Sequence, residues 1–286
     1  MGGGTYSLHA RATRSATNNW DTKSAAEIFT NRTVNKQMDP INILLRESRD
    51  SDEHPNSLAT IVALDVTGSM GMVPHNLVQN GLPKLMEKII QAGERDNQVL
   101  FMAVGDHQCD RSPLQVGQFE CSDELLDKWL TEVYLEGGGG ANEGESYLLA
   151  WWFAALNTSV DCFEKRSRKG FLFTIGDEPT LGSISGNSLD KITGKGQNKN
   201  WSASDLLAEA SKMYNVFHIH IGETYAGRQQ YVVDGWKKLM GDNLLIAQHH
   251  DQVPDLISDT IINLSKREEV VPHFKTTSEA PSEMVL

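Results

Sequence analysis

Three oxygen-bearing side chains stand at alternate positions in the string ALDVTGSMG, which follows an apolar run. They are Asp65, Thr67 and Ser69. A carboxylate and two hydroxyls on a tight loop can point at one centre, and ligation by oxygen alone suits a hard cation such as Mg²⁺. Because hydroxyls add no formal charge, such a cation stays electron-poor and can accept a carboxylate from outside the chain. The same spacing also occurs where a strand leads into a capped helix, which is a purely structural role.

Two further segments can bring oxygen ligands to the same centre. The glycine run 137–140 leads into Asn142, and a loop this rich in glycine can place Asn142 or its own backbone close to an ion. The string FTIGDEP delivers Asp177 directly after another apolar run. A second carboxylate there is expected to bond the ion or a water that the ion coordinates.

These side chains need a sheet that brings them to one edge. Short, nearly continuous apolar runs predict buried strands at 57–64, 98–104, 170–175, 215–221 and 243–247. Amphipathic or apolar stretches predict helices at 75–93, 121–134, 145–157, 202–214, 226–240 and 253–266. Strands that alternate with helices indicate an α/β fold, a Rossmann-like, mostly parallel sheet with helices on both faces.

Four of the five predicted strands run into an acidic residue. These residues are Asp65, Asp106, Asp177 and Glu223. Since ligands of an open parallel sheet bind outside the carboxyl ends of its strands, the four carboxylates are expected to share the ligand-binding edge. For Asp106 and Glu223, each preceded by glycine, a loop-starting carboxylate in contact with solvent is the favoured interpretation.

The chain divides into three parts by composition. Residues 1–56 lack a sustained apolar period and are predicted to form a partly flexible N-terminal arm, residues 57–267 the folded domain, and residues 268–286 a loose tail. The first twenty residues carry Arg11 and Arg14 and no acidic residue. They could dock on an acidic body, either their own or a neighbour's, and a mobile tail is an equally good interpretation.

Charge and cysteine content exclude several classes of protein. The 286 residues include 26 Lys and Arg against 38 Asp and Glu, and the resulting net charge of −12 disfavours nucleic acid as a partner. The three cysteines form no C-x-x-C pair, so a disulfide framework or a thiolate zinc site is not supported and a reducing compartment fits. No apolar stretch is long enough to span a membrane, and we expect a cytoplasmic protein.

The combination of loops resembles the metal-ion-dependent adhesion site (MIDAS) of von Willebrand factor A (VWA) domains, in particular their bacterial and phage branch. The string DVTGSM carries the resemblance, which extends over roughly residues 57–267. It implies a VWA-like fold, with Asp65, Thr67 and Ser69 as ligands and Asp177 as the distant carboxylate. The glycine-rich loop lacks the threonine of the family pattern, so Asn142 or a main-chain group would take its place.

The function expected first is a non-enzymatic interaction module in which Mg²⁺, or Mn²⁺ or Ca²⁺, accepts an acidic side chain from a protein partner. The resemblance further implies MoxR-type AAA+ ATPases as partners. One alternative is a metal-dependent hydrolase that uses Asp106, His107 and Asp177 at the same edge. Another is a structural component of an assembly such as a phage particle, with the arm bridging neighbours.

His218 and His220 are interpreted as packed core or interface histidines.

Overall fold

A six-stranded sheet forms the centre of the computed structural model, which describes residues 4–68, 70–137, 144–194 and 199–270. The strand order is β10-β9-β6-β2-β3-β4. The five parallel strands are β2 (Leu58–Asp65), β3 (Asn97–Val104), β6 (Gly170–Gly176), β9 (Tyr214–Ile221) and β10 (Leu244–Ala247), and β4 (Leu114–Val116) pairs antiparallel with β3. The predicted α/β class with a mostly parallel sheet is confirmed, and the short antiparallel edge strand β4 was not predicted.

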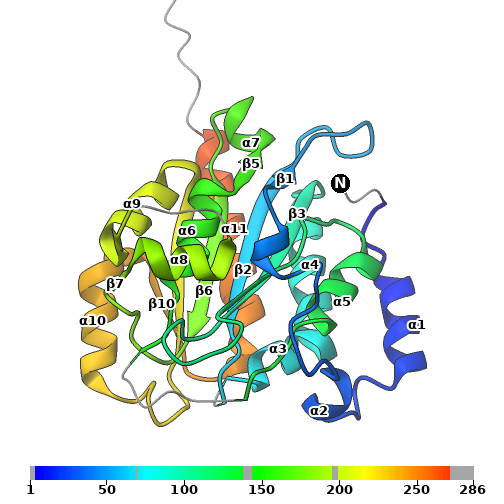
Figure 1. Ribbon diagram of the computed structural model, residues 1–286. Coiled ribbons are helices and arrows are strands. Elements are labelled where there is room, and N and C mark those ends of the chain that lie inside the picture. The colour runs from blue at the N-terminus through cyan, green and yellow to red at the C-terminus, as the bar shows by residue number, and fades with distance from the viewer. Residues whose placement is uncertain (1–3, 69, 138–143, 195–198, 271–286) are drawn as a thin grey trace, which may run out of the picture.

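Helices cover both faces of the sheet, and for this reason every residue of β2, β3 and β6 is buried. Figure 1 shows α6 and α9 packed together on one face and α4 and α11 on the other. The helices after β2 are α3 (Met72–Asn76), a π-helical turn η2 (Leu77–Gly81), α4 (Leu82–Gln91), α5 (Asp123–Thr131), α6 (Leu148–Leu156), α7 (Asp161–Glu164), α8 (Gly186–Thr193), α9 (Ala203–Met213), α10 (Gln230–Met240) and α11 (Val253–Val270). Single 3-10 turns are η3 (Gly241–Asn243) and η4 (His250–Gln252).

Helix α6 is apolar all the way round because it has no solvent-facing side over most of its length. Trp151, Trp152 and Phe153 are fully buried in it, and Trp151 meets Trp236 of α10 edge to face. Core packing therefore accounts for this aromatic run.

The N-terminal segment packs on the body of the protein. It contains α1 (Leu8–Asn18), α2 (Ala25–Ile28), the 3-10 turn η1 (Pro40–Asn42) and β1 (Arg46–Ser48), which pairs in parallel with β5 (Thr158–Val160) in a two-stranded sheet. A second small sheet joins β7 (Ser183–Ile184) to β8 (Trp201–Ser202). Met38 and Phe29 are buried in the same hydrophobic core as the large sheet.

Two arginines hold α1 on α5. Arg11 is almost fully buried, and its Nε lies 2.7 Å from Asp127 Oδ1. Arg14 bonds Asp123 at 2.6 Å and Asp127 at 2.7 Å. The docking of these arginines on an acidic body is thus observed, and the body is the chain's own. A buried pair of this kind is strongly sensitive to the loss of one partner.

The strand register brings the predicted acidic residues to one edge. Asp65 is the last residue of β2 and pairs with Val104 of β3, while Leu64 pairs with Ile175 of β6. The residue after each of these strands therefore enters the same rim of loops. Among the described residues, no helix is both long and apolar enough to cross a membrane.

Candidate functional site

The loop after β2 folds back on the carboxylate that precedes it. Asp65 is fully buried, and its Oδ1 accepts hydrogen bonds from the backbone N–H of Thr67 (2.9 Å) and from Thr67 Oγ1 (2.6 Å). This tight turn brings two of the three predicted ligands of the D-x-T-x-S string together. The third, Ser69, lies outside the described residues.

Tyr147, at the start of α6, secures the second oxygen of this carboxylate. Its hydroxyl donates to Asp65 Oδ2 at 2.6 Å, and both groups are fully buried. The tyrosine reaches Asp65 by passing over Gly176 at the end of β6, where a Cβ atom would overlap the Tyr147 hydroxyl. Glycine at 176 is therefore required by this close approach, and it leaves room for the bond that fixes Asp65.

Two more carboxylates gather around Asp65. Burial raises the pKa of Asp65 to about 7, and the nearby charge of Asp177, itself fully buried after β6, adds to the rise. Burial also raises the pKa of Glu145 to about 9, helped by the charges of Asp65 and Asp110. The structure thus concentrates carboxyl groups in a dry environment that favours their neutral forms, and a cation there would stabilise the ionised forms.

Backbone hydrogen bonds hold Glu145 in this position. Its N–H donates to Pro179 O at 2.8 Å, and its carbonyl accepts from Leu181 N at 2.9 Å. The next residue, Ser146, donates its N–H to Gly105 O at 3.1 Å. The short segment after the glycine-rich loop is therefore clamped between the loops that follow β3 and β6. Asn142, the ligand predicted in that glycine-rich loop, lies outside the described residues.

Asp106, the acid after β3, is buried, so the expected contact of its carboxylate with solvent is wrong. Its Oδ1 caps the loop by accepting from Gln108 N at 2.9 Å, and its own N–H donates to Asp110 Oδ2 at 2.7 Å. The fold of the 106–110 loop over Gly105 shields it. Glu223, by contrast, keeps partial exposure and accepts from His250 N at 2.8 Å.

His107 and Ser146 are linked across the same edge. Ser146 Oγ accepts the backbone N–H of His107 at 2.9 Å and lies 2.7 Å from His107 Nδ1. Burial lowers the pKa of His107. Since Ser146 is fully buried, its hydroxyl holds the loop and is not accessible to attack a substrate.

His218 and His220 belong to the core, as predicted. Both are fully buried, and the His218 ring stacks on Trp236 with 3.4 Å between ring centroids. Tyr147 meets the same His218 ring edge to face at 5.2 Å. Burial drives the pKa of His218 well below its usual value, so it stays neutral and packs as an aromatic ring beneath the site.

The donor set fits a hard cation better than zinc. Among the described residues, no group of three or more His, Cys, Asp or Glu side chains is arranged to hold a metal ion. A cation at this edge would therefore depend on hydroxyl and water oxygens besides carboxylates, which is the ligation that Mg²⁺ accepts. Within the same residues, buried oxygens of Asp106 and Glu145 lack a hydrogen-bond partner. That observation fits a missing positive group.

Sequence reasoning overlooked the roles of Glu145 and Tyr147. Both stand in the string GESY, directly after the glycine-rich loop, at the start of a helix. An acid and a hydroxyl directly after a glycine-rich stretch of sequence were the available signal. The hydrogen bond of Tyr147 to Asp65, however, depends on how α6 lies across β6, and so does the position of Glu145 near it.

Comparison with known proteins adds a remote likeness of shape. Neither a protein-family model nor a curated protein sequence matches the chain. Among solved structures, the pilus adhesin SpaC from Lactobacillus rhamnosus GG in its open conformation is 10% identical with a TM-score of 0.46, covering 77% of this chain and 31% of that one. The vWF domain of the type V pili tip protein Mfa5 from Porphyromonas gingivalis is 9% identical with a TM-score of 0.46, covering 77% of this chain and 98% of that one.

Proximal thread matrix protein 1 from the mussel byssus is 11% identical with a TM-score of 0.43, covering 73% of this chain and 48% of that one. This chain spans about a third of the length of the pilus adhesin SpaC. At such identities and TM-scores, these similarities carry no argument about function. The fold class rests on the sheet itself, and the function must be argued from the residues at its edge.

Proposed function

We propose that this chain is a protein-interaction module that uses a divalent cation, Mg²⁺ or alternatively Mn²⁺ or Ca²⁺, at the carboxyl edge of its sheet. The observation that carries the proposal is the buried carboxylate of Asp65, which shares its edge with Asp177 and Glu145. Within the described residues, no lysine or arginine pairs with Asp65 or Glu145. A buried carboxylate without a cationic partner either shifts its pKa and becomes neutral or coordinates a metal ion, and a metal ion here would keep Asp65 ionised.

The predicted ligands would have different roles at this edge. Asp65 and Thr67 would bind the ion with Ser69, while Asp177 would bond it or one of its waters and Asn142 would contribute from the glycine-rich loop. Thr67 is already held on Asp65 by two hydrogen bonds, so its hydroxyl is in place before a cation arrives. Because hydroxyls and water carry no charge, the ion would keep a net positive charge toward solvent and attract an acidic side chain.

The partner in this proposal is a protein that presents an aspartate or glutamate. A charge-assisted bond between that carboxylate and the ion would make the association depend on both the cation and the acid. The MoxR-type AAA+ ATPase, the cytoplasmic location and a role in a phage assembly stay predictions, as does a metal-dependent hydrolase using His107.

Calorimetric titration of Mg²⁺ and Mn²⁺ into chelator-treated protein tests the cation site. We expect one site in the wild type and a loss of at least about tenfold in affinity in Asp65→Asn and in Thr67→Val, which keeps the shape but lacks the hydroxyl. Asp242→Asn is the matched control, because Asp242 is exposed on η3. Equal affinities in all four proteins would refute the site.

The hydrolase alternative is separated by an activity measurement. Phosphoester and peptide substrates are incubated with the wild type in Mg²⁺, Mn²⁺ and Zn²⁺. The interaction module predicts no turnover above buffer, whereas turnover abolished by His107→Ala would establish the enzyme.

A further inference from the structure

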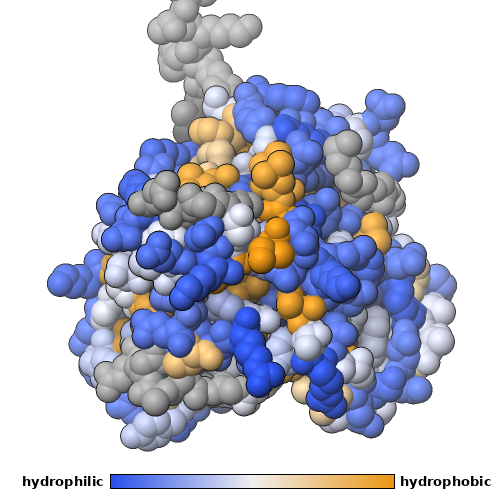
Figure 2. Space-filling model, in the orientation of Figure 1, coloured by the Kyte–Doolittle hydropathy of each residue, from blue (hydrophilic) through white to orange (hydrophobic). Residues whose placement is uncertain are grey.

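An apolar band runs over the surface of the N-terminal segment, from η1 toward β1, and continues to the end of α6. Ile41, Leu44, Leu45 and Leu156 are 53%, 81%, 42% and 45% exposed. Leu45 and Leu156 are close in space, because Arg46 N donates to Asn157 O and Asn157 Nδ2 donates to Leu44 O. Figure 2 shows apolar side chains gathered over the centre of this face. Contiguous exposed apolar surface of this kind marks interaction sites.

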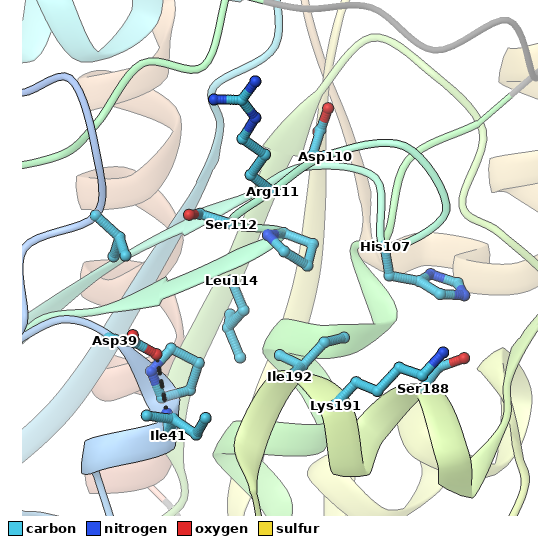
Figure 3. A pocket seen from close by; sticks show the side chains of 13 residues that line it. Asp39, Ile41, His107, Asp110, Arg111, Ser112, Leu114, Ser188, Lys191 and Ile192 are labelled. Atoms are coloured by element: carbon cyan, nitrogen blue, oxygen red, sulfur yellow. Dashed lines mark hydrogen bonds between the residues drawn. The ribbon is translucent and has the colours of Figure 1, made fainter.

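At Ile41 the band reaches a groove of about 370 Å³. Three segments that are distant in the sequence line it: residues 34–41, the loop 107–114 and α8. In Figure 3, Leu114 and Ile192 lie in the middle of the groove, between Ile41 on one side and His107 on the other. The middle of the groove is thus apolar and can receive a side chain of similar character.

Two basic residues stand on the wall of the groove. Arg111 and Lys191 are exposed and line it, and neither makes an ion pair with another described residue. Asp39 and Asp110 also line the groove, but Asp110 Oδ2 accepts from Asp106 N, and Asp39 Oδ1 accepts from Ile41 N at 3.1 Å. Each acid thus accepts a backbone hydrogen bond within the fold, whereas the side chains of Arg111 and Lys191 have no ion partner among the described residues and can pair with an acidic ligand.

The groove lies beside the candidate cation site. His107 lines the groove, and its Nδ1 lies 2.7 Å from the Oγ of Ser146, the neighbour of Glu145. Asp110 also lines the groove, and its charge adds to the raised pKa of Glu145. A chain lying in the groove would therefore approach the carboxyl edge of the sheet on leaving it past His107.

We propose that the band and the groove together bind an extended, acidic segment of the protein partner. An apolar side chain of that segment fills the groove between Ile41 and Ile192, and an acidic residue beside it reaches the cation. This inference rests on the proposed function and names the partner's chemistry: apolar and acidic residues adjacent in sequence. The apolar contacts supply affinity, since one charge-assisted bond alone leaves much of the entropy of association uncompensated.

Two of the three walls of the groove lie outside the central sheet and its crossover helices. One wall is the N-terminal segment and another is α8, which lies in the long connection between β6 and α9. Ile41 packs against Gly194 just after α8, where an added Cβ would lie 2.9 Å from Ile41 Cγ1. The two walls therefore touch each other at Ile41 and Gly194.

The test uses a display library of random peptides, selected on the full chain in Mg²⁺ and eluted with chelator. We expect enriched peptides to carry Asp or Glu next to Leu, Ile, Val or Phe. The affinity of one enriched peptide is then measured by fluorescence anisotropy for the wild type, Ile41→Asp, Lys191→Glu and Leu8→Ser. Leu8 is a partly exposed apolar residue on α1, outside the groove, and serves as the control.

The proposal predicts a loss of about tenfold or more in peptide affinity for Ile41→Asp, a smaller loss for Lys191→Glu and no change for Leu8→Ser. Mg²⁺ binding of all three variants should match the wild type. Unchanged peptide affinity in Ile41→Asp, or enrichment of acidic peptides without apolar neighbours, would overturn it. If sedimentation shows that the wild type is a dimer and that Ile41→Asp is a monomer, the groove is occupied by a second copy of this chain and the partner named above is wrong.

The same experiments distinguish a failure of the proposed cation site from a failure of the groove. Peptide binding that persists in chelator and is lost in Ile41→Asp would uphold the groove and refute the role of the cation. Mg²⁺ binding by a wild type that enriches no peptide would uphold the cation site and overturn the groove.

Discussion

Replacing Asp65 by asparagine should stabilise the protein when no cation is present. Asp65 is fully buried, and its two oxygens accept hydrogen bonds from Thr67 and Tyr147. In Asp65→Asn, the amide oxygen can keep both bonds from Thr67, and the new NH₂ group can donate to the Tyr147 hydroxyl. The substitution therefore removes the charge with little change in shape.

The pKa of Asp65 gives the size of this effect. Burial and the charge of Asp177 raise it from 3.8 to about 7, and each unit is worth about 1.4 kcal/mol, so ionised Asp65 costs about 4 kcal/mol in the folded state. The folded pKa is above the unfolded one. The wild type therefore has its full free energy of unfolding below pH 3.8, where Asp65 is protonated in both states, and loses this contribution as the pH rises through 7. At pH 8 the variant should be more stable than the wild type by up to about 4 kcal/mol, and near pH 4 the two should be similar.

Urea unfolding measures this difference in chelator at pH 8 and near pH 4, with Asp242→Asn as the control. Adding Mg²⁺ at pH 8 should stabilise the wild type by about 2.7 kcal/mol at one hundred times its dissociation constant, and should stabilise Asp65→Asn by no more than about 1.4 kcal/mol, the value for a site tenfold weaker. A variant less stable than the wild type at pH 8 in chelator would refute the reasoning, because the carboxylate would then be stabilising without a cation.

Three further substitutions test the supports of the site and the docking of α1. Tyr147→Phe should lower the free energy of unfolding at pH 8 by about 1–3 kcal/mol, because Asp65 Oδ2 loses its buried donor; an unchanged urea midpoint would contradict this. Gly176→Ala should displace Tyr147, destabilise the protein by about 1–3 kcal/mol and weaken Mg²⁺ binding in calorimetry, and retention of wild-type Mg²⁺ affinity would be evidence against it. Asp127→Ala should cost about 3–5 kcal/mol in thermal or urea unfolding, because Arg11 stays buried without its partner, and adding Arg11→Met should recover part of the loss. A double variant as unstable as Asp127→Ala alone would argue against that explanation.

The parallel strands could be predicted because each is buried on both faces and therefore reads as a continuous apolar run. The run SLATIVAL predicted β2, and GFLFTI predicted β6, to within a residue or two at each end. Strand β4 has only three residues and exists because it pairs with β3, so its pattern is too short to indicate a strand. The buried residues of the N-terminal segment, such as Met38, are spaced too irregularly to show a period.

In the candidate site, likewise, some contacts arise between neighbouring residues and others between residues distant in the sequence. Asp65 and Thr67 meet within one turn, so their spacing alone predicted that they lie together, although not the hydrogen bond between them. Tyr147 meets Asp65 across 82 positions of sequence, and only the packing of α6 over Gly176 brings them together. The burial of Asp106 likewise depends on the loop that folds back through Asp110, a contact that residue types alone do not indicate.

The central claim is that a divalent cation binds beside Asp65. Crystals of the wild type grown in Mn²⁺ and measured at the manganese absorption edge test it most directly. The account predicts an anomalous peak about 2.1–2.3 Å from oxygens of Asp65 and Thr67, at the carboxyl edge of the sheet, and no peak there in Asp65→Asn. A wild-type map with no peak at this edge, or with the ion bound elsewhere and Asp65 contacting only Thr67 and Tyr147, would contradict it.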